Sequence, residues 1–285
     1  MKHHIDPTTD CIFKAILGNP KQTDVLIHFL NSVTHPTVPI TSVQILNPYN
    51  DKEFQTDKLT VVDVKARDKV GKTYQIEIQL KLSPSLPARI LYTWSDLYQS
   101  QLQSGEAFET LQPVISIWLL TSIILPESQA SHHHFEVWDP LHHLRLLDHC
   151  SIHLLELPKW KKPQGKKLKD EEVWFYFFDS AKEWDELPQE LQPISAMRKA
   201  MAILKMFSEK EKNYHLYQAR QNALREERER DRLFSQTAER LQEALQQKEE
   251  ALQQKEEERK QKEEERKQKE RLMEILKRAG IDPHS

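Results

Sequence analysis

The sequence predicts an α/β protein with a mixed central sheet flanked by helices, followed by a long charged helix. Helical and strand patterns alternate through roughly the first two hundred of the 285 residues. Nearly all aromatic residues and prolines lie in that segment, as expected for a folded core. After it, proline is absent between Pro193 and Pro283, and glycine between Gly165 and Gly280, so nothing interrupts a helix. We therefore expect a globular domain over residues 1–215 and a helical tail over 216–285.

Two helices open the globular part. Apolar residues recur at helical spacing over Asp10–Leu17, and the Gly-Asn-Pro sequence at 18–20 ends the pattern. A second helical pattern covers Thr23–Leu30. A longer helix is predicted over Leu86–Gln103.

The strands are indicated by runs of β-branched and other apolar residues between turn residues. The connection Arg67–Lys72 is short enough to join two strands as a hairpin. Helices, three strands, a helix and further strands give the order of an α/β fold with a mixed sheet. The predicted strands are Ser42–Leu46, Leu59–Ala66, Tyr74–Leu80 and Val114–Leu120, with weaker strands at Phe135–Trp138 and Ile152–Leu157.

A carboxylate interrupts one of the apolar strands. Asp63 stands between two valines, where a buried charge is costly unless it is paired, hydrated or bound to a cation. Because side chains alternate along a strand, Glu77, Gln79 and Lys81 share one face, and the hairpin places Glu77 across from Asp63. A divalent cation held by oxygen ligands relieves the repulsion between facing carboxylates, and Mg²⁺ in such a site favours phosphodiester hydrolysis. The alternation alone favours a simpler alternative, a sheet face exposed to solvent.

Composition excludes several classes of protein. The formal net charge of −3, from 41 basic and 44 acidic residues, lacks the basic excess of a protein that coats nucleic acid. Two cysteines, Cys11 and Cys150, cannot build a disulfide framework. The longest apolar runs, such as Val114–Leu120, are far too short to cross a membrane. We expect a cytoplasmic protein with no membrane association, in which any action on DNA must come from a local site.

Histidines are the other metal-ligating candidates. The 13 histidines include His132–His134 and His142–His143, and His149 and His153 lie four residues apart. No cysteine pair completes a zinc site, so histidines in loops are the favoured interpretation. The sequence has no glycine-rich phosphate loop, no G-x-S-x-G and no H-E-x-x-H, so no motif supports nucleotide hydrolysis, an esterase or a zinc protease.

The tail repeats with a period of seven residues. Glu243–Glu249 and Glu250–Glu256 are identical, as are the next two heptads, Glu257–Glu263 and Glu264–Glu270. A short leucine seam gives way to lysine and arginine, whereas Glu–Lys pairs four residues apart each stabilise an isolated helix by about 0.2–0.5 kcal/mol. We favour a charge-stabilised or weakly self-associating helix over a tight coiled coil. The pairs are Glu256–Lys260, Glu258–Lys262, Glu263–Lys267 and Glu265–Lys269.

Several blocks, in this order along the chain, resemble a known family. They are Asp10-Cys-Ile-Phe13-Lys14 with Leu17-Gly18, Phe29-Leu30-Asn31, Val62-Asp63-Val64 with Ile76-Glu77-Ile78-Gln79, Arg89-x-x-Tyr92, Gln101-Leu102-x-x-Gly105, Leu155–Lys159 and Trp174-x-x-Phe177. Together they resemble the Rpn branch, the recombination-promoting nucleases and transposases, of the PD-(D/E)XK nuclease superfamily. The resemblance extends from about residue 6 to about residue 215 and implies a restriction-endonuclease-like core.

The resemblance implies roles for individual residues. Asp63 and Glu77 would hold Mg²⁺, and Gln79 stands where the superfamily has a lysine that positions the attacking water or steadies the phosphate. Asp10 matches an acidic residue on the first helix that completes the site. Because glutamine carries no charge, part of the lysine's role must pass to the metal or to a nearby cation. The residues expected to contact phosphate are Lys14, Lys65, Lys81 and Arg89.

The function so implied is a Mg²⁺-dependent DNA endonuclease linked to recombination or mobile elements, with Asp63, Glu77, Gln79 and Asp10 as catalytic residues. We expect it to form a homo-oligomer, so that two sites act on two strands. The alternative is a catalytically inactive DNA-binding or scaffold protein that keeps the nuclease fold and recruits partners through its tail. An intact cluster of Asp10, Asp63 and Glu77 would favour the enzyme.

Overall fold

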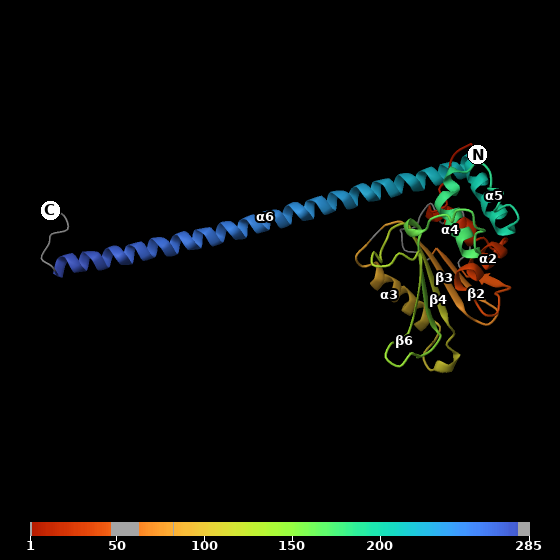
Figure 1. Ribbon diagram of the computed structural model, residues 1–285, viewed down its shortest axis with the longest axis horizontal. Helices are drawn as coiled ribbons and strands as arrows, with labels where there is room; N and C mark the ends of the chain where they lie inside the picture. Colours follow the sequence, from red (N-terminus) through yellow and green to blue (C-terminus); the bar gives the residue numbers. More distant parts are fainter. Residues whose placement is uncertain (1, 47–62, 82, 279–285) are drawn as a thin grey trace. The chain divides into compact units, whose positions relative to one another are not determined.

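A computed structural model of the protein describes residues 2–46, 63–81 and 83–278. The chain divides into two compact units, Met1–Gln221 and Asn222–Ser285. The first unit contains the central sheet and the helices that cover it (Figure 1). Within the described ranges, no helix is both long enough and apolar enough to cross a membrane.

A six-stranded mixed sheet forms the centre of the first unit. Its strands are β1 (Val43–Ile45), β2 (Val64–Asp68), β3 (Thr73–Gln79), β4 (Val114–Leu120), β5 (His132–Glu136) and β8 (Cys150–Glu156), and a separate ribbon joins β6 (Trp138–Asp139) to β7 (Leu144–Arg145). The strand order is β1-β2-β3-β4-β8-β5. β4 pairs in parallel with both β3 and β8, and the other pairs are antiparallel. This mixed sheet confirms the predicted fold class.

Helices cover both faces of the sheet. They are α1 (Asp10–Leu17), α2 (Thr23–Thr34), α3 (Leu86–Gln99), α4 (Asp170–Ser180) and α5 (Ser195–Glu209). On one face, α1, α2, α4 and α5 form a large core in which Trp174 and Phe177 are fully buried. On the other face, Leu86 and Ile90 of α3 pack in a smaller core with Trp118 of β4. Figure 1 shows α2, α4 and α5 gathered on one side of the strands and α3 on the other.

Several boundaries differ from the sequence prediction; the second helix, for example, continues to Thr34 and the strand predicted from Phe135 begins at His132. The strand expected from Leu59 begins, within the described residues, at Val64, and residues 59–62 of the prediction lie outside them. The third helix was expected to reach Gln103 but ends at Gln99. The reason is Gln101, whose side chain accepts a hydrogen bond from the N–H of Gln112 at 3.0 Å and donates one to its carbonyl at 2.9 Å. This side chain ties the chain to the segment that enters β4.

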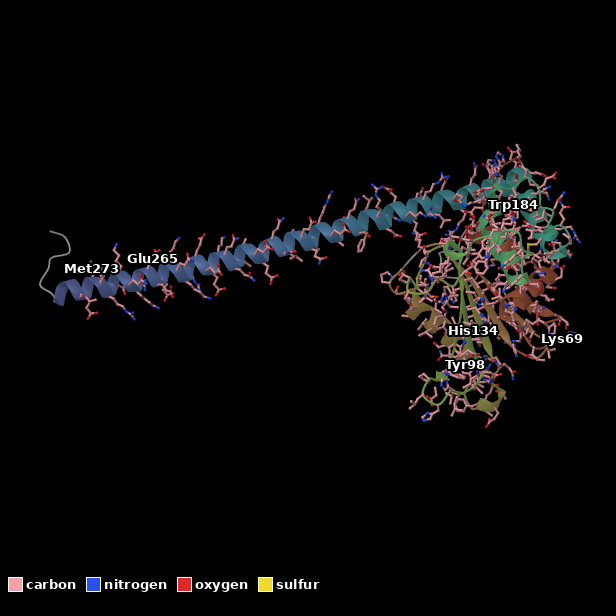
Figure 2. The ribbon with its side chains drawn as sticks, viewed as in Figure 1. Lys69, Tyr98, His134, Trp184, Glu265 and Met273 are labelled. Carbon is pink, nitrogen blue, oxygen red and sulfur yellow. The ribbon has the colours of Figure 1, made fainter. Side chains whose placement is uncertain are left out.

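The tail forms one helix, α6 (Glu211–Arg278), of 68 residues. Its seam leucines are exposed, with 61% of Leu241 and 58% of Leu252 accessible to solvent. Two of the predicted ion pairs form, Glu256–Lys260 at 3.6 Å and Glu263–Lys267 at 3.0 Å. Side chains such as Glu265 and Met273 project outward along the helix (Figure 2). These features match a charge-stabilised helix, and self-association of the tail stays a prediction.

The first turns of α6 belong to the first unit and contact the segment that leads into α1. Tyr214 stacks its ring on that of His3, with the centroids 3.7 Å apart. Three further contacting residues are spaced i, i+3 and i+4, so they lie on one side of the helix. The contacts are a hydrogen bond from the N–H of Asp6 to the Tyr217 hydroxyl at 3.2 Å, one from Arg220 Nε to Asp10 Oδ1 at 2.8 Å, and one from Gln221 Nε2 to Thr9 Oγ1 at 2.7 Å. All three lie beyond residue 215, where the sequence predicted the globular domain to end.

Truncation after Leu233 should leave the melting temperature of the first unit unchanged. It keeps the contacts of Tyr217, Arg220 and Gln221 and removes a helix whose surface ion pairs contribute about 0–1 kcal/mol each. Truncation after His215 should lower the melting temperature by several degrees, because each lost hydrogen bond contributes about 0.5–1.5 kcal/mol. Thermal melts followed by circular dichroism measure both effects, and equal melting of the two truncated proteins would contradict the prediction.

Candidate active site

Asp63, just before β2, and Glu77, near the carboxyl end of β3, lie on the same side of the β2–β3 hairpin. Val64 pairs with Ile76, and one further step along this register puts Asp63 opposite Glu77. Asp63 Oδ2 accepts a hydrogen bond from the N–H of Ile78 at 2.7 Å. The N–H of Asp63 in turn donates to the Glu77 carboxylate. Facing residues on adjacent strands have Cβ atoms about 4.5–5.5 Å apart, so the two carboxylates are neighbours.

Burial perturbs both carboxylates. Glu77 is only 6% exposed, and burial raises its pKa to about 7. Burial, and then the charge of Glu77, raise the pKa of Asp63 well above its usual value. The positive charge of Lys14 opposes both shifts, and that of Arg89 opposes the shift of Glu77. Two carboxylates held together at this electrostatic cost supply the hard oxygen ligands that a divalent cation prefers.

A chain of buried hydrogen bonds orients Glu77. Gln75, fully buried on β3, donates from its amide to Glu77 Oε1 at 3.1 Å. The hydroxyl of Ser116 on β4 donates to Gln75 Oε1 at 3.3 Å and accepts from the indole N–H of Trp118 at 2.9 Å. Each polar group in this chain therefore has a partner, and the orientation of Glu77 depends on residues of two strands.

Gln79 hydrogen-bonds to the side chain of Arg89 and not to the two carboxylates. Its Oε1 accepts a hydrogen bond from Arg89 of α3 at 3.2 Å, and its Nε2 donates to the carbonyl of Lys81 at 2.8 Å. The Arg89 guanidinium also lies over the ring of Trp118, 5.6 Å from its centroid. Arg89 is exposed, so its remaining N–H groups face solvent close to Glu77. An uncharged residue at position 79 thus holds a charged group beside the site.

The first helix brings Lys14 to the site. Lys14 is 7% exposed, and its charge acts on both Asp63 and Glu77. At Gly18, the end of α1, a Cβ would lie 2.7 Å from the carbonyl oxygen of Lys14 in the same helix and at an ordinary contact distance, 3.5 Å, from Val64. Another residue at position 18 would therefore force the end of α1 to shift.

The remaining predicted residues, Asp10, Lys65 and Lys81, differ in how they relate to the carboxylate pair. The charge of Asp10 acts on Asp63, but its carboxylate is paired with Arg220. Lys65 lies two residues after Asp63 on β2, opposite Gln75, and Lys81 follows the end of β3. Over the ranges 2–46, 63–81 and 83–278, no three His, Cys, Asp or Glu side chains are arranged to hold a metal ion. Asp63 and Glu77 are a pair of facing carboxylates that could hold a divalent cation if water supplied its remaining ligands.

A comparison with known families now assigns the chain. A model of the PD-(D/E)XK nuclease family transposases matches residues 7–230. The chain belongs to this family. No curated protein and no solved structure shows a significant match. The matched range includes Asp10, Asp63, Glu77 and the first turns of α6, whereas the heptad repeats that begin at Glu243 lie outside it. Assignment to the Rpn branch stays a prediction.

The loop prediction holds for only some of the named histidines: His142, His143 and His149 lie in turns, whereas His132–His134 and His153 lie in strands. His132–His134 form most of β5, an edge strand of the nuclease sheet. Contacts run from Ser151 Oγ to His153 at 3.0 Å, from His153 to His132 at 2.9 Å, and from His132 to Glu171 at 3.1 Å. Burial lowers the pKa of His153 to about 2, so its ring is neutral and only weakly basic near neutral pH. The ion pair between His132 and Glu171 joins the edge strand β5 to α4.

Two features of the site are absent from the sequence prediction. Gln75 follows the same alternation that identified Glu77 and Gln79, so the strand period contained a signal for it. Arg220 is separated from Asp10 by 210 residues, and no local pattern indicates that the two meet.

Glu77→Gln should stabilise the metal-free protein at pH 8 but not at pH 5. The pKa of Glu77 is raised from 4.5 to about 7, so between these values the folded protein holds a proton that the unfolded chain has lost. Wild-type stability therefore falls as pH rises through this window, and glutamine removes that loss. Melting temperatures of the variant, with exposed Glu109→Gln as the control, measure the effect; a difference from wild type that is constant between pH 5 and pH 8 would rule it out.

Proposed function

We propose that the protein is a Mg²⁺-dependent DNA endonuclease whose cation is held by Asp63 and Glu77. The observation that carries the proposal is the pair of buried, facing carboxylates at the carboxyl end of β3, within a chain of a nuclease family. Among the residues that the structure describes, Ile78 hydrogen-bonds Asp63, and Gln75 and the N–H of Asp63 hydrogen-bond Glu77, and a carboxylate with so few partners can still bind a cation. We place its action in the cytoplasm, where the free thiols of Cys11 and Cys150 stay reduced.

The residues of the site have distinct roles in hydrolysis. When bound, the cation would polarise the phosphate and lower the pKa of water to that of a useful nucleophile. The N–H of Ile78 fixes the Asp63 carboxylate, and the Gln75 amide fixes that of Glu77. Attack of the water oxygen on phosphorus breaks the bond to the leaving oxygen and yields a phosphate monoester and a hydroxyl group. Negative charge grows on the phosphate oxygens during this step, so a nearby cation lowers its barrier.

Arg89 is the positively charged side chain best placed to stabilise the charge that grows on the phosphate oxygens. Gln79 and the Trp118 ring hold its guanidinium near Glu77, and its exposed face is open to a phosphate group. Gln79 therefore acts through Arg89, as a positioning residue, in place of the lysine of related nucleases. Lys14, Lys65 and Lys81 add positive charge around the same strand ends.

Asp63→Asn should abolish Mg²⁺-dependent plasmid nicking and leave the protein folded. The substitution removes one cation ligand and also the repulsion from Glu77, so the metal-free fold should be at least as stable at neutral pH. The exposed residue Asp96 supplies the control, since Asp96→Asn makes the same chemical change on α3. Nicking is compared with and without Mg²⁺, and melting temperature reports folding.

The same assay separates the enzyme from a catalytically inactive DNA-binding protein. Wild-type protein that binds DNA but does not nick it with Mg²⁺ or Mn²⁺ would support the inactive alternative. Loss of folding together with loss of activity in Asp63→Asn would indicate a structural role for this carboxylate.

Arg89→Ala should slow nicking by roughly 100-fold, the usual effect of removing one group that stabilises transition-state charge. Arg89→Lys should recover part of the rate, because a cation returns without the planar fork that Gln79 orients. The Mg²⁺ concentration for half-maximal rate should change little. The exposed β2 residue in Arg67→Ala is the matched control, and equal rates for Arg89→Ala and Arg67→Ala would refute the role of Arg89.

A further inference from the structure

The base of α6, residues 217–221, contacts Asp10, the predicted acidic site residue that is not part of the Asp63–Glu77 pair. Asp10 begins α1, and Arg220 approaches it from the third turn of α6. Gln221 and Tyr217 contact the neighbouring residues Thr9 and Asp6. Three adjacent contacts fix this part of α6, so the guanidinium of Arg220 has a defined position.

Both oxygens of the Asp10 carboxylate are already engaged. Oδ1 accepts from the N–H of Cys11 at 2.8 Å and from Arg220 Nε at 2.8 Å. Oδ2 forms an ion pair with the Nη2 atom of Arg220. This is the two-point arrangement in which arginine binds carboxylate most strongly. While this pairing persists, both oxygens of Asp10 are engaged by Arg220, and among the described residues no three His, Cys, Asp or Glu side chains are grouped to hold a metal ion.

Asp10 nevertheless lies near the site. Its charge raises the pKa of Asp63, after burial and the charge of Glu77. The carboxylate is also only partly buried, with 21% of its side chain exposed. A carboxylate at this place attracts a divalent cation to the site. That attraction is weaker while Arg220 neutralises the carboxylate and stronger when the two separate.

We propose that Arg220 competes with the divalent cation for Asp10, so that the base of α6 sets the cation affinity of the site. The inference rests on the proposed function, because it assigns a regulator to the same Asp63–Glu77 site. Arg220 is a positioning residue that acts through Asp10. A partner that changes the first turns of α6 would change the cation affinity without touching Asp63 or Glu77.

Calcium binding to the full-length protein tests this inference without any need for catalysis. Isothermal titration calorimetry should show that Arg220→Gln binds Ca²⁺ at least about threefold more tightly than wild type, because the cation no longer competes with a guanidinium. Asp10→Asn should bind more weakly than wild type. In the Asp10→Asn background, Arg220→Gln should have little further effect, since the residue through which it acts is gone.

Two further variants keep the test decisive. Arg228→Gln makes the same change in charge two turns along the same helix and should bind Ca²⁺ as wild type does. Arg220→Lys keeps a cation, which protects folding if the glutamine variant is unstable, but loses the fork and should also bind more tightly than wild type. Circular dichroism confirms that each variant is folded.

The outcomes separate this inference from the proposed function. Wild-type affinity in both Arg220 variants, or equal tightening in the presence and absence of the Asp10 carboxylate, would overturn the role of Arg220 and leave the cation site intact. Undiminished Ca²⁺ binding by Asp63→Asn, or no binding by any variant, would overturn the cation site itself and the inference with it.

Discussion

Asp63 and Glu77 place two like charges side by side in a largely apolar environment, and most polar contacts around them reduce the cost of doing so. The N–H of Ile78 and the amide of Gln75 hydrogen-bond the carboxylates, while Lys14 and Arg89 supply opposite charge. These groups come from one strand, β3, and two helices, α1 and α3. The sheet, α1 and α3 must therefore be in register before the pair can exist, which links the integrity of the fold to the integrity of the site.

Local rules were sufficient to predict the carboxylate pair. Strand alternation assigns Glu77 and Gln79 to one face, and the short connection at 69–72 fixes the hairpin register that puts Asp63 opposite Glu77. The order of helices and strands likewise predicted a mixed sheet, because each element carries its own apolar pattern. The family adds that this arrangement is a nuclease fold.

The features that the sequence did not predict depend on contacts between distant residues. Arg89 reaches Gln79 from α3, and Arg220 reaches Asp10 across 210 residues. The early end of α3 depends on Gln101 meeting Gln112, and the strand at His132–His134 depends on an edge beside β8 that accepts polar side chains. None of these is a property of a window of consecutive residues, so propensity and periodicity could not indicate them.

The heptads of α6 have a consequence for how the tail can vary in length. They begin at Glu243, well after the residues that contact Asp6, Thr9 and Asp10. Adding or removing one heptad changes the helix by about 10 Å and rotates its far end by only about 20°. Duplication in units of seven therefore changes the length of the helix but hardly changes the direction, around the helix axis, in which its far end faces. Whatever surface the end of the helix presents would keep its direction around the helix axis, and the turns at Arg220 would be undisturbed.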